Sequence, residues 1–183
     1  IFAKNIKADD LSRFLNSDYA ARQLIYTYKD GWDERISPRE LLLVLQRSGL
    51  SDWKRMVANH PEIFVSVLRQ DEAHDLLVSP DVMQYVVSNY ADGWDVLFSP
   101  DVLLASIRQD NSSDTREAIF SHPEIFAKDI PLDYLYDLLG SSRIEVRDFL
   151  SHYNGGWSVR ITPRDFIDFI HDKYSDDWYK QVI

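Results

Sequence analysis

The chain has 183 residues, 45% hydrophobic and 13% aromatic, and its formal net charge is -10. This composition argues against a disordered chain, and the acidic balance disfavours phosphate-bearing partners such as nucleic acids and anionic membrane surfaces. Because the chain contains no cysteine, disulfides and thiolate metal sites are excluded. No apolar run reaches the roughly 20 residues of a membrane span. The lack of cysteine and of a visible signal peptide favours an intracellular location.

A tandem repeat dominates the sequence. The segment His60-Pro61-Glu62-Ile63-Phe64 recurs at residues 122–126, and the opening segment 1–4 matches residues 125–128. These offsets define a period of 62 residues, which splits into two halves of about 31. All five tryptophans fall into two equivalent classes, which are Trp32, Trp94 and Trp157, and Trp53 and Trp178.

Each half is predicted to begin with a helix, called A here. Serine or threonine followed by proline opens three of them, as in Ser37-Pro38, because the hydroxyl caps a free N–H and proline suits the first helical position. The apolar residues that follow recur at the helical period, as from Leu41 to Leu45. The six A helices are expected to begin near Ile6, Ile36, Leu68, Phe98, Ile130 and Ile161.

A second helix, called B, follows in each half. Its predicted N-caps are serines, and an aspartate follows most of them, which suits the positive end of the helix dipole. The predicted caps are Ser17, Ser51, Ser79, Ser113, Ser142 and Ser175. Odd-numbered B helices are expected to end at a Tyr-x-x-Gly-Trp joint through a left-handed glycine, and even-numbered ones at a His-Pro joint.

These elements predict an all-α fold, a right-handed α-solenoid of about six helical hairpins, or 12 helices, formed by residues 1–183 as a single repeat domain. The hairpin length and the paired amphipathic helices resemble HEAT-like repeats. That family has a proline kink in its first helix and an Asp/Arg ladder between repeats. Here the prolines stand at helix starts, and Gln84 interrupts the row of basic B-helix residues, which are Arg22, Arg55, Arg116, Arg147 and Lys180.

Trp32, Trp94 and Trp157 are the candidate partner-binding residues. A row of exposed tryptophans suits peptide binding, whereas rings that fill the gaps between hairpins belong to the core, and the core interpretation is favoured. His60, His122 and His152 lie at B-helix ends, where an imidazole caps carbonyls. Residues one or two hairpins apart, ~10–20 Å, are too distant to share a metal ion.

No catalytic, cofactor-binding or metal-binding residue is therefore assigned. The acidic clusters lack the spacing of calcium loops, and no catalytic motif or phosphate-binding glycine loop is present. The first hypothesis is a non-enzymatic scaffold that binds another protein or peptide, favouring a basic or amphipathic one, along one face of the array.

Two alternatives remain. Since the sequence begins and ends within a repeat, it is expected to be a slice of a longer array, and the second hypothesis is an auxiliary region of a larger enzyme or toxin-like effector. A catalytic array acting through its histidines is the third and least favoured hypothesis.

Overall fold

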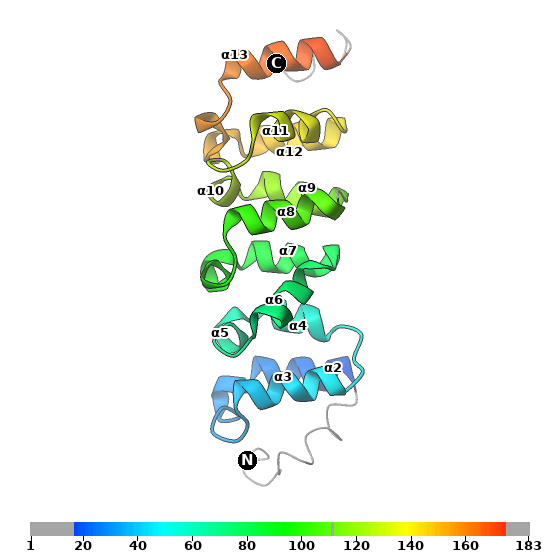
Figure 1. Ribbon diagram of the computed structural model, residues 1–183, viewed down its shortest axis with the longest axis vertical. Coiled ribbons are helices and arrows are strands. Elements are labelled where there is room, and N and C mark those ends of the chain that lie inside the picture. The colour runs from blue at the N-terminus through cyan, green and yellow to red at the C-terminus, as the bar shows by residue number, and fades with distance from the viewer. Residues whose placement is uncertain (1–16, 111, 175–183) are drawn as a thin grey trace. The chain divides into compact units, whose positions relative to one another are not determined.

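The structure, a computed structural model, describes residues 17–110 and 112–174, apart from the side chain of residue 110. These ranges contain twelve α-helices, five short 3-10 helices and no strand, which confirms the all-α prediction (Figure 1). The first expected A helix, near Ile6, and the last B helix, with Ser175 and Trp178, lie outside the described residues. The chain divides into two compact units, residues 1–98 and 99–183.

Each unit consists of helices joined by short connections. Unit 1 contains α2 (Asp18–Tyr26), η2 (Tyr28–Asp30), α3 (Pro38–Arg47), α4 (Trp53–Ala58), α5 (Pro61–Phe64), α6 (Gln70–Leu77), α7 (Pro80–Ser88), η3 (Tyr90–Asp92) and η4 (Trp94–Val96). Unit 2 contains α8 (Pro100–Asp110), α9 (Ser113–Ser121), α10 (Pro123–Phe126), α11 (Leu132–Leu139), α12 (Arg143–Ser151), η5 (Tyr153–Gly155), η6 (Trp157–Val159) and α13 (Pro163–Lys173).

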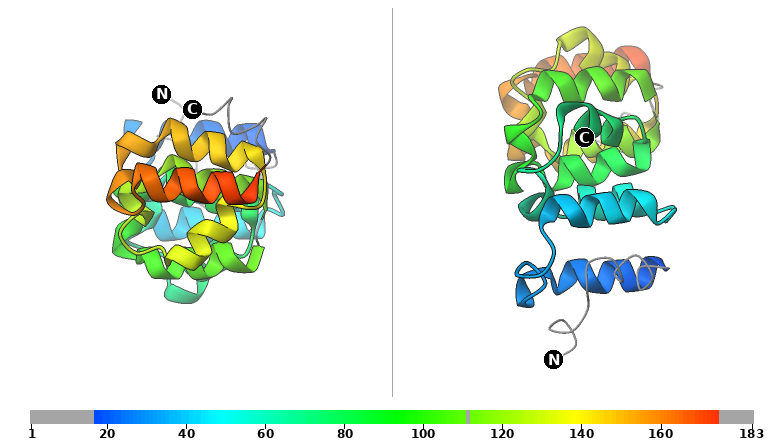
Figure 2. Two further views of the ribbon diagram at one scale, coloured as in Figure 1. Left: turned by 90° about the horizontal axis from the view of Figure 1, so that it is seen from above. Right: turned by 60° about the horizontal axis from the view of Figure 1, so that its bottom comes forward.

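Helices of the same class pack on one another inside each unit. The B helix α4 contacts α2 and α7 in unit 1, and α9 contacts α12 in unit 2. The A helices α3, α6, α8 and α11 also contact their B partners, which are α4, α7, α9 and α12. Within each unit the helix axes run roughly alongside one another in both views of Figure 2. This packing is compatible with a helical repeat.

Ten of the twelve expected helices lie within the described ranges, and these ranges contain two further helices that were not expected. The His-Pro segments were predicted as joints, whereas each forms a one-turn helix, α5 or α10. Proline is suited to the first turn because it has no N–H to leave unpaired. The His60 carbonyl accepts bonds from the amides of Ile63 and Phe64, and both of these side chains are buried. Each His-Pro segment therefore contributes to the core as well as ending a helix.

The capping predictions hold at several helices and shift by one residue at others. Ser37 and Glu40 form a capping box at α3, and Thr162 caps α13. Asp52 instead of Ser51 occupies the N-cap position of α4, without a side-chain capping bond, and Ser112 instead of Ser113 caps α9. The shift is physically small, because a serine or aspartate oxygen can serve either of two adjacent cap positions.

The glycine joints repeat the same hydrogen bond. The hydroxyls of Tyr28, Tyr90 and Tyr153 each donate to the carbonyl eight residues later, at 2.6, 2.8 and 2.7 Å. Gly31 and Gly93 have φ values of 116° and 145°, which L side chains rarely adopt. The tyrosine therefore fixes the path of the chain into the next A helix.

The glycine joints also pack on the His-Pro helices. The ring N–H of Trp94 donates to the Ala58 carbonyl at 2.9 Å, and that of Trp157 to Phe120 at 3.0 Å. A Cβ added at Gly156 would lie 2.8 Å from the Cβ of Pro123, so only glycine fits without displacement. The two joint types therefore contact each other inside each unit.

Candidate functional site

The three candidate tryptophans differ in exposure. Trp94 and Trp157 have no exposed surface, so their rings fill the space between consecutive hairpins and present nothing to a partner. Trp32 is only half-buried. Of the other class, Trp53 is half-buried as well.

The histidines form local contacts and no shared site. Nδ1 of His60 lies 3.0 Å from Glu62, and Nδ1 of His122 lies 2.9 Å from Glu124, two residues away in each case. Nδ1 of His152 lies 3.0 Å from the Asp148 carbonyl, which is the predicted capping role. Over the described ranges, no three His, Cys, Asp or Glu side chains are grouped so that they could hold a metal ion.

A hollow of about 130 Å³ lies among the B helices of unit 1. Its walls come from α2 and α4, the two residues after α4, and α7. The lining residues are Arg22, Ile25, Tyr26, Arg55, Met56, Asn59, His60 and Tyr85. The volume is below the ~300–1,000 Å³ of small-molecule sites, but it approaches the ~150 Å³ cavity that takes up benzene. The hollow therefore has room for one side chain of a partner.

Two arginines on the rim form ion pairs with aspartates that do not line the hollow. Arg22 of α2 pairs with Asp52, and Arg55 of α4 pairs with Asp81 of α7. Hydrogen bonds from Ser79 and then from Arg55 lower the pKa of Asp81, and the bond to Asp81 raises the pKa of Arg55. Neither aspartate lines the hollow, so only the basic partners face it.

The remaining rim combines aromatic rings with an amide. Tyr26 is 69% exposed, and its ring meets His60 edge to face at 5.6 Å. The side-chain oxygen of Asn59 accepts a hydrogen bond from the side-chain NH₂ of Asn89 at 3.3 Å. The NH₂ group of Asn59 makes no hydrogen bond within the described residues. The Asn59 NH₂ is thus available to an incoming carbonyl.

The lining residues depart from the 62-residue period. For the lining residues up to His60, the positions 62 residues later hold Gln84, Val87, Ser88, Glu117, Ala118, Ser121 and His122. The equivalent of Tyr85 lies 63 residues later, as Trp157 does from Trp94, and is Asp148, so only the histidine is retained. Features that serve the fold recur with the period, so residues that break it are the better candidates for function.

The sequence analysis missed this hollow. It placed Arg22 and Arg55 in a row of basic residues, but it did not pair them with acids. The available signal was an acidic residue at the start of the next B helix. For Arg22 this is Asp52, 30 residues later, and for Arg55 it is Asp81, 26 residues later.

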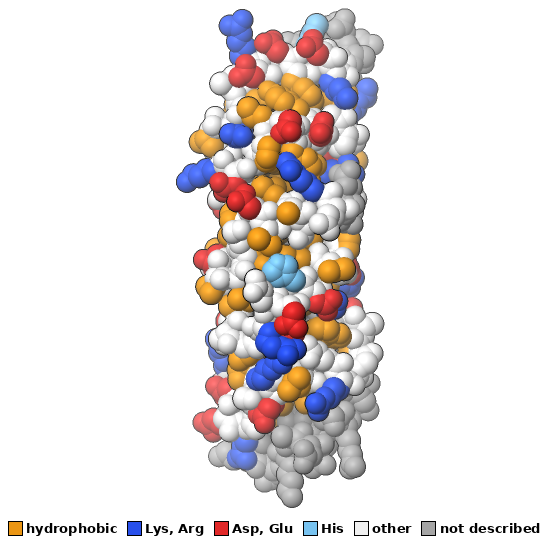
Figure 3. Space-filling view, viewed as in Figure 1, with side chains coloured by type: hydrophobic (Ala, Val, Ile, Leu, Met, Phe, Trp, Pro, Cys, Tyr) orange, Lys and Arg blue, Asp and Glu red, His pale blue; other side chains and the backbone are white. Residues whose placement is uncertain are grey.

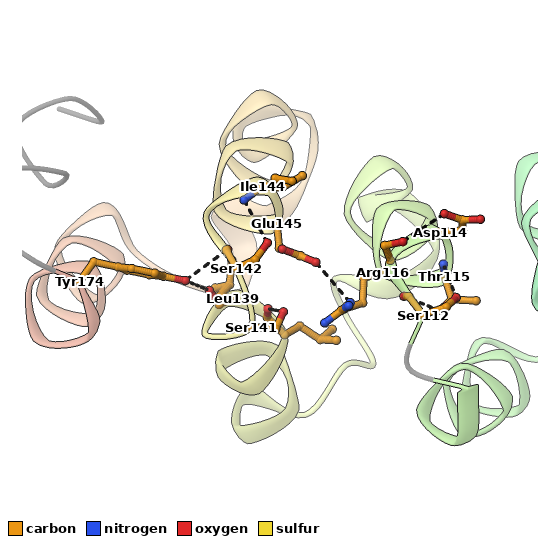
Figure 4. A network of polar contacts seen from close by, with 12 residues as sticks. Ser112, Asp114, Thr115, Arg116, Leu139, Ser141, Ser142, Ile144, Glu145 and Tyr174 are labelled. Carbon is orange, nitrogen blue, oxygen red and sulfur yellow. Dashed lines mark hydrogen bonds and ion pairs between the residues drawn. The ribbon is translucent and has the colours of Figure 1, made fainter.

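Unit 2 has a different polar cluster, drawn in Figure 4. Nε of Arg116 in α9 lies 3.3 Å from Oε1 of Glu145 in α12, and Glu145 is only 5% exposed. The hydroxyl of Tyr174, which follows α13, donates to the Leu139 carbonyl at 2.7 Å (Figure 4). These contacts connect successive helices, so we assign them to the fold.

The opposite side of unit 1 carries the A helices α3 and α6 (Figure 1). Figure 3 shows the face on which α3 and α6 lie, and there basic, acidic and hydrophobic side chains are interspersed without a large area of one sign. Among the helices that the structure describes, none is long and apolar enough to cross a membrane. No protein-family model, curated protein or solved structure matches the chain.

Proposed function

We propose that the chain is a HEAT-like α-solenoid module without enzymatic activity, which binds another protein through the B-helix face of unit 1. This proposal rests on the hollow among α2, α4 and α7. Its lining residues differ from those at the equivalent positions of the next repeat, whereas the residues of the joints and of the core recur. Extended helical repeats bind partners along the surface formed by one helix of each hairpin.

The exposed side chains on this face support protein binding. Tyr26 combines a large apolar area with a polar tip and few rotatable bonds, and tyrosine and arginine are enriched at the energetic centres of protein interfaces. Arg22 and Arg55 are held in place by their aspartates, so less conformational entropy is lost when a partner binds.

Site-specific cross-linking tests the proposal. A photoreactive benzoylphenylalanine replaces Tyr26, and in the control it replaces Tyr19, which lies on the same helix and is 74% exposed. After irradiation in cells that express the protein, we expect position 26, but not position 19, to form a reproducible adduct with one protein. Equal adducts from both positions, or none from position 26, would contradict the proposal, as would binding of RNA or a small molecule at the hollow.

A further inference from the structure

We infer that the occupant of the hollow is a short acidic-apolar peptide segment, with one apolar side chain inside the hollow and a carboxylate against the arginines of its rim. This inference rests on the proposed function, since it specifies which protein segment that site would recognise.

The floor of the hollow is apolar. Ile25 and Met56 are 2% and 5% exposed and close its base, while the rings of Tyr26 and Tyr85 contribute to its walls. A volume of about 130 Å³ accommodates one aliphatic or aromatic side chain and excludes most of its solvent. The aromatic walls favour a flat or branched apolar group, because rings pack well edge to face or offset.

The charged groups that line the rim are basic, although each arginine is ion-paired with an aspartate and Arg55 has all three guanidinium nitrogens near Asp52 or Asp81. The sequence has 30 acidic and 20 basic residues, yet the eight lining residues include two arginines and no carboxylate. Asp52 contacts one terminal nitrogen of Arg22, and the other guanidinium N–H groups of Arg22 form no hydrogen bond or ion pair with the described residues. Guanidinium N–H groups match the geometry of a carboxylate.

The net charge of -10 does not prevent this contact over a short distance. At physiological ionic strength, charges more than ~8 Å away are largely screened, so a segment of few residues meets mainly the two arginines and the aspartates paired with them. A long acidic partner would be repelled by the remaining surface. The free NH₂ of Asn59 adds a donor for a main-chain carbonyl. The rim therefore offers mainly donors, as a peptide with carbonyl and carboxylate groups requires.

A random 12-residue peptide library displayed on phage tests the inference when it is selected on the full chain. We expect the selected peptides to share an apolar residue next to aspartate or glutamate. The affinity of the best peptide is then measured by fluorescence polarisation. Changing its acid to the amide, or changing Arg22→Gln in the protein, should each weaken binding about tenfold, and the two changes together should weaken it little further.

A variant of the wall residue Tyr26 and a matched control complete the test. Tyr26→Ala is expected to weaken binding by tenfold or more, whereas Tyr19→Ala leaves it unchanged. Far-UV circular dichroism verifies that each variant is folded. Higher salt should weaken binding of the wild type more than that of Arg22→Gln.

Enrichment of basic peptides, the absence of a consensus, or a Tyr26 effect without any Arg22 effect would overturn the inference. A Lys-rich peptide and oligouridine serve as additional probes, and tighter binding of either would have the same consequence. If position 26 still cross-links to one protein, the proposed function stands although the inference fails. If that adduct is also missing, both fail.

Discussion

Trp94 provides the sharpest test of how consecutive hairpins are held together. Its ring is fully buried and stacks on Phe98 with the centroids 5.8 Å apart. Its N–H donates to the carbonyl of Ala58, the last residue of α4. The last carbonyls of a helix have no partner inside it, so Trp94 satisfies an acceptor that would otherwise be buried and unpaired.

The structure separates two contributions of this side chain. Trp94→Phe keeps most of the ring but leaves the Ala58 carbonyl without a donor, which is expected to cost about 1–3 kcal/mol. Trp94→Ala also removes the buried ring and is expected to cost about 3–5 kcal/mol. Trp32 occupies the same repeat position but is half-buried, so Trp32→Ala should cost about half as much or less.

Urea unfolding followed by far-UV circular dichroism measures these differences, because this signal does not depend on the mutated fluorophore. Urea midpoints should decrease in the order wild type, Trp94→Phe, Trp94→Ala, with Trp32→Ala above Trp94→Ala. A Trp94→Phe variant as stable as the wild type would refute the role of the hydrogen bond. Equal losses for Trp94→Ala and Trp32→Ala would refute the packing argument.

Three further predictions follow from other contacts. Gly156→Ala should lower the thermal unfolding midpoint more than Gly155→Ala, because the added Cβ meets the proline ring of α10 at 2.8 Å in the first case and at 3.8 Å in the second; equal midpoints would contradict this close approach. The bond from Arg39, followed by contacts with Arg69, lowers the pKa of Glu72 from an ordinary value of 4.5 to about 2. This carboxylate therefore stabilises the fold above pH 4.5, and the stabilisation is lost as the pH falls towards 2. Glu72→Gln should be less stable by about 1–2 kcal/mol at pH 7 and similar to the wild type near pH 2 by urea titration; a constant difference would reject the pairing. Arg55→Glu and Asp81→Arg should each destabilise unit 1, while the double variant recovers about 0.2–1 kcal/mol in a double-mutant cycle; additive losses would count against the ion pair.

The helices and their ends were largely predictable because their signals are local. Serine, threonine and proline at helix starts act through hydrogen bonds within three or four residues, as Ser37 does with Glu40. Glycine at the joints acts through its own φ angle, as at Gly31. The His-Pro segments were misjudged because a proline that stops one helix can equally begin the next, and only the burial of Ile63 and Phe64 shows that it does.

The candidate site was not predictable in the same way. Its walls come from three helices about 30 residues apart, and the period of the sequence does not state which side chains of those helices share a space. Tyr26, Met56 and Tyr85 follow no motif, and they become a group only through the packing of α4 against α2 and α7.

The sequence by itself determined the all-α class, the period and the placement of the joints, since each depends on the conformational preferences of neighbouring residues and on a pattern that recurs. The tertiary structure decided which joints touch, why Trp94 is buried while Trp32 is not, and where a side chain of a partner could enter. These properties depend on contacts between residues that are distant in the chain. A repeat supplies equivalent positions for such contacts, but the individual side chains at each position determine whether the space between helices is filled or left open.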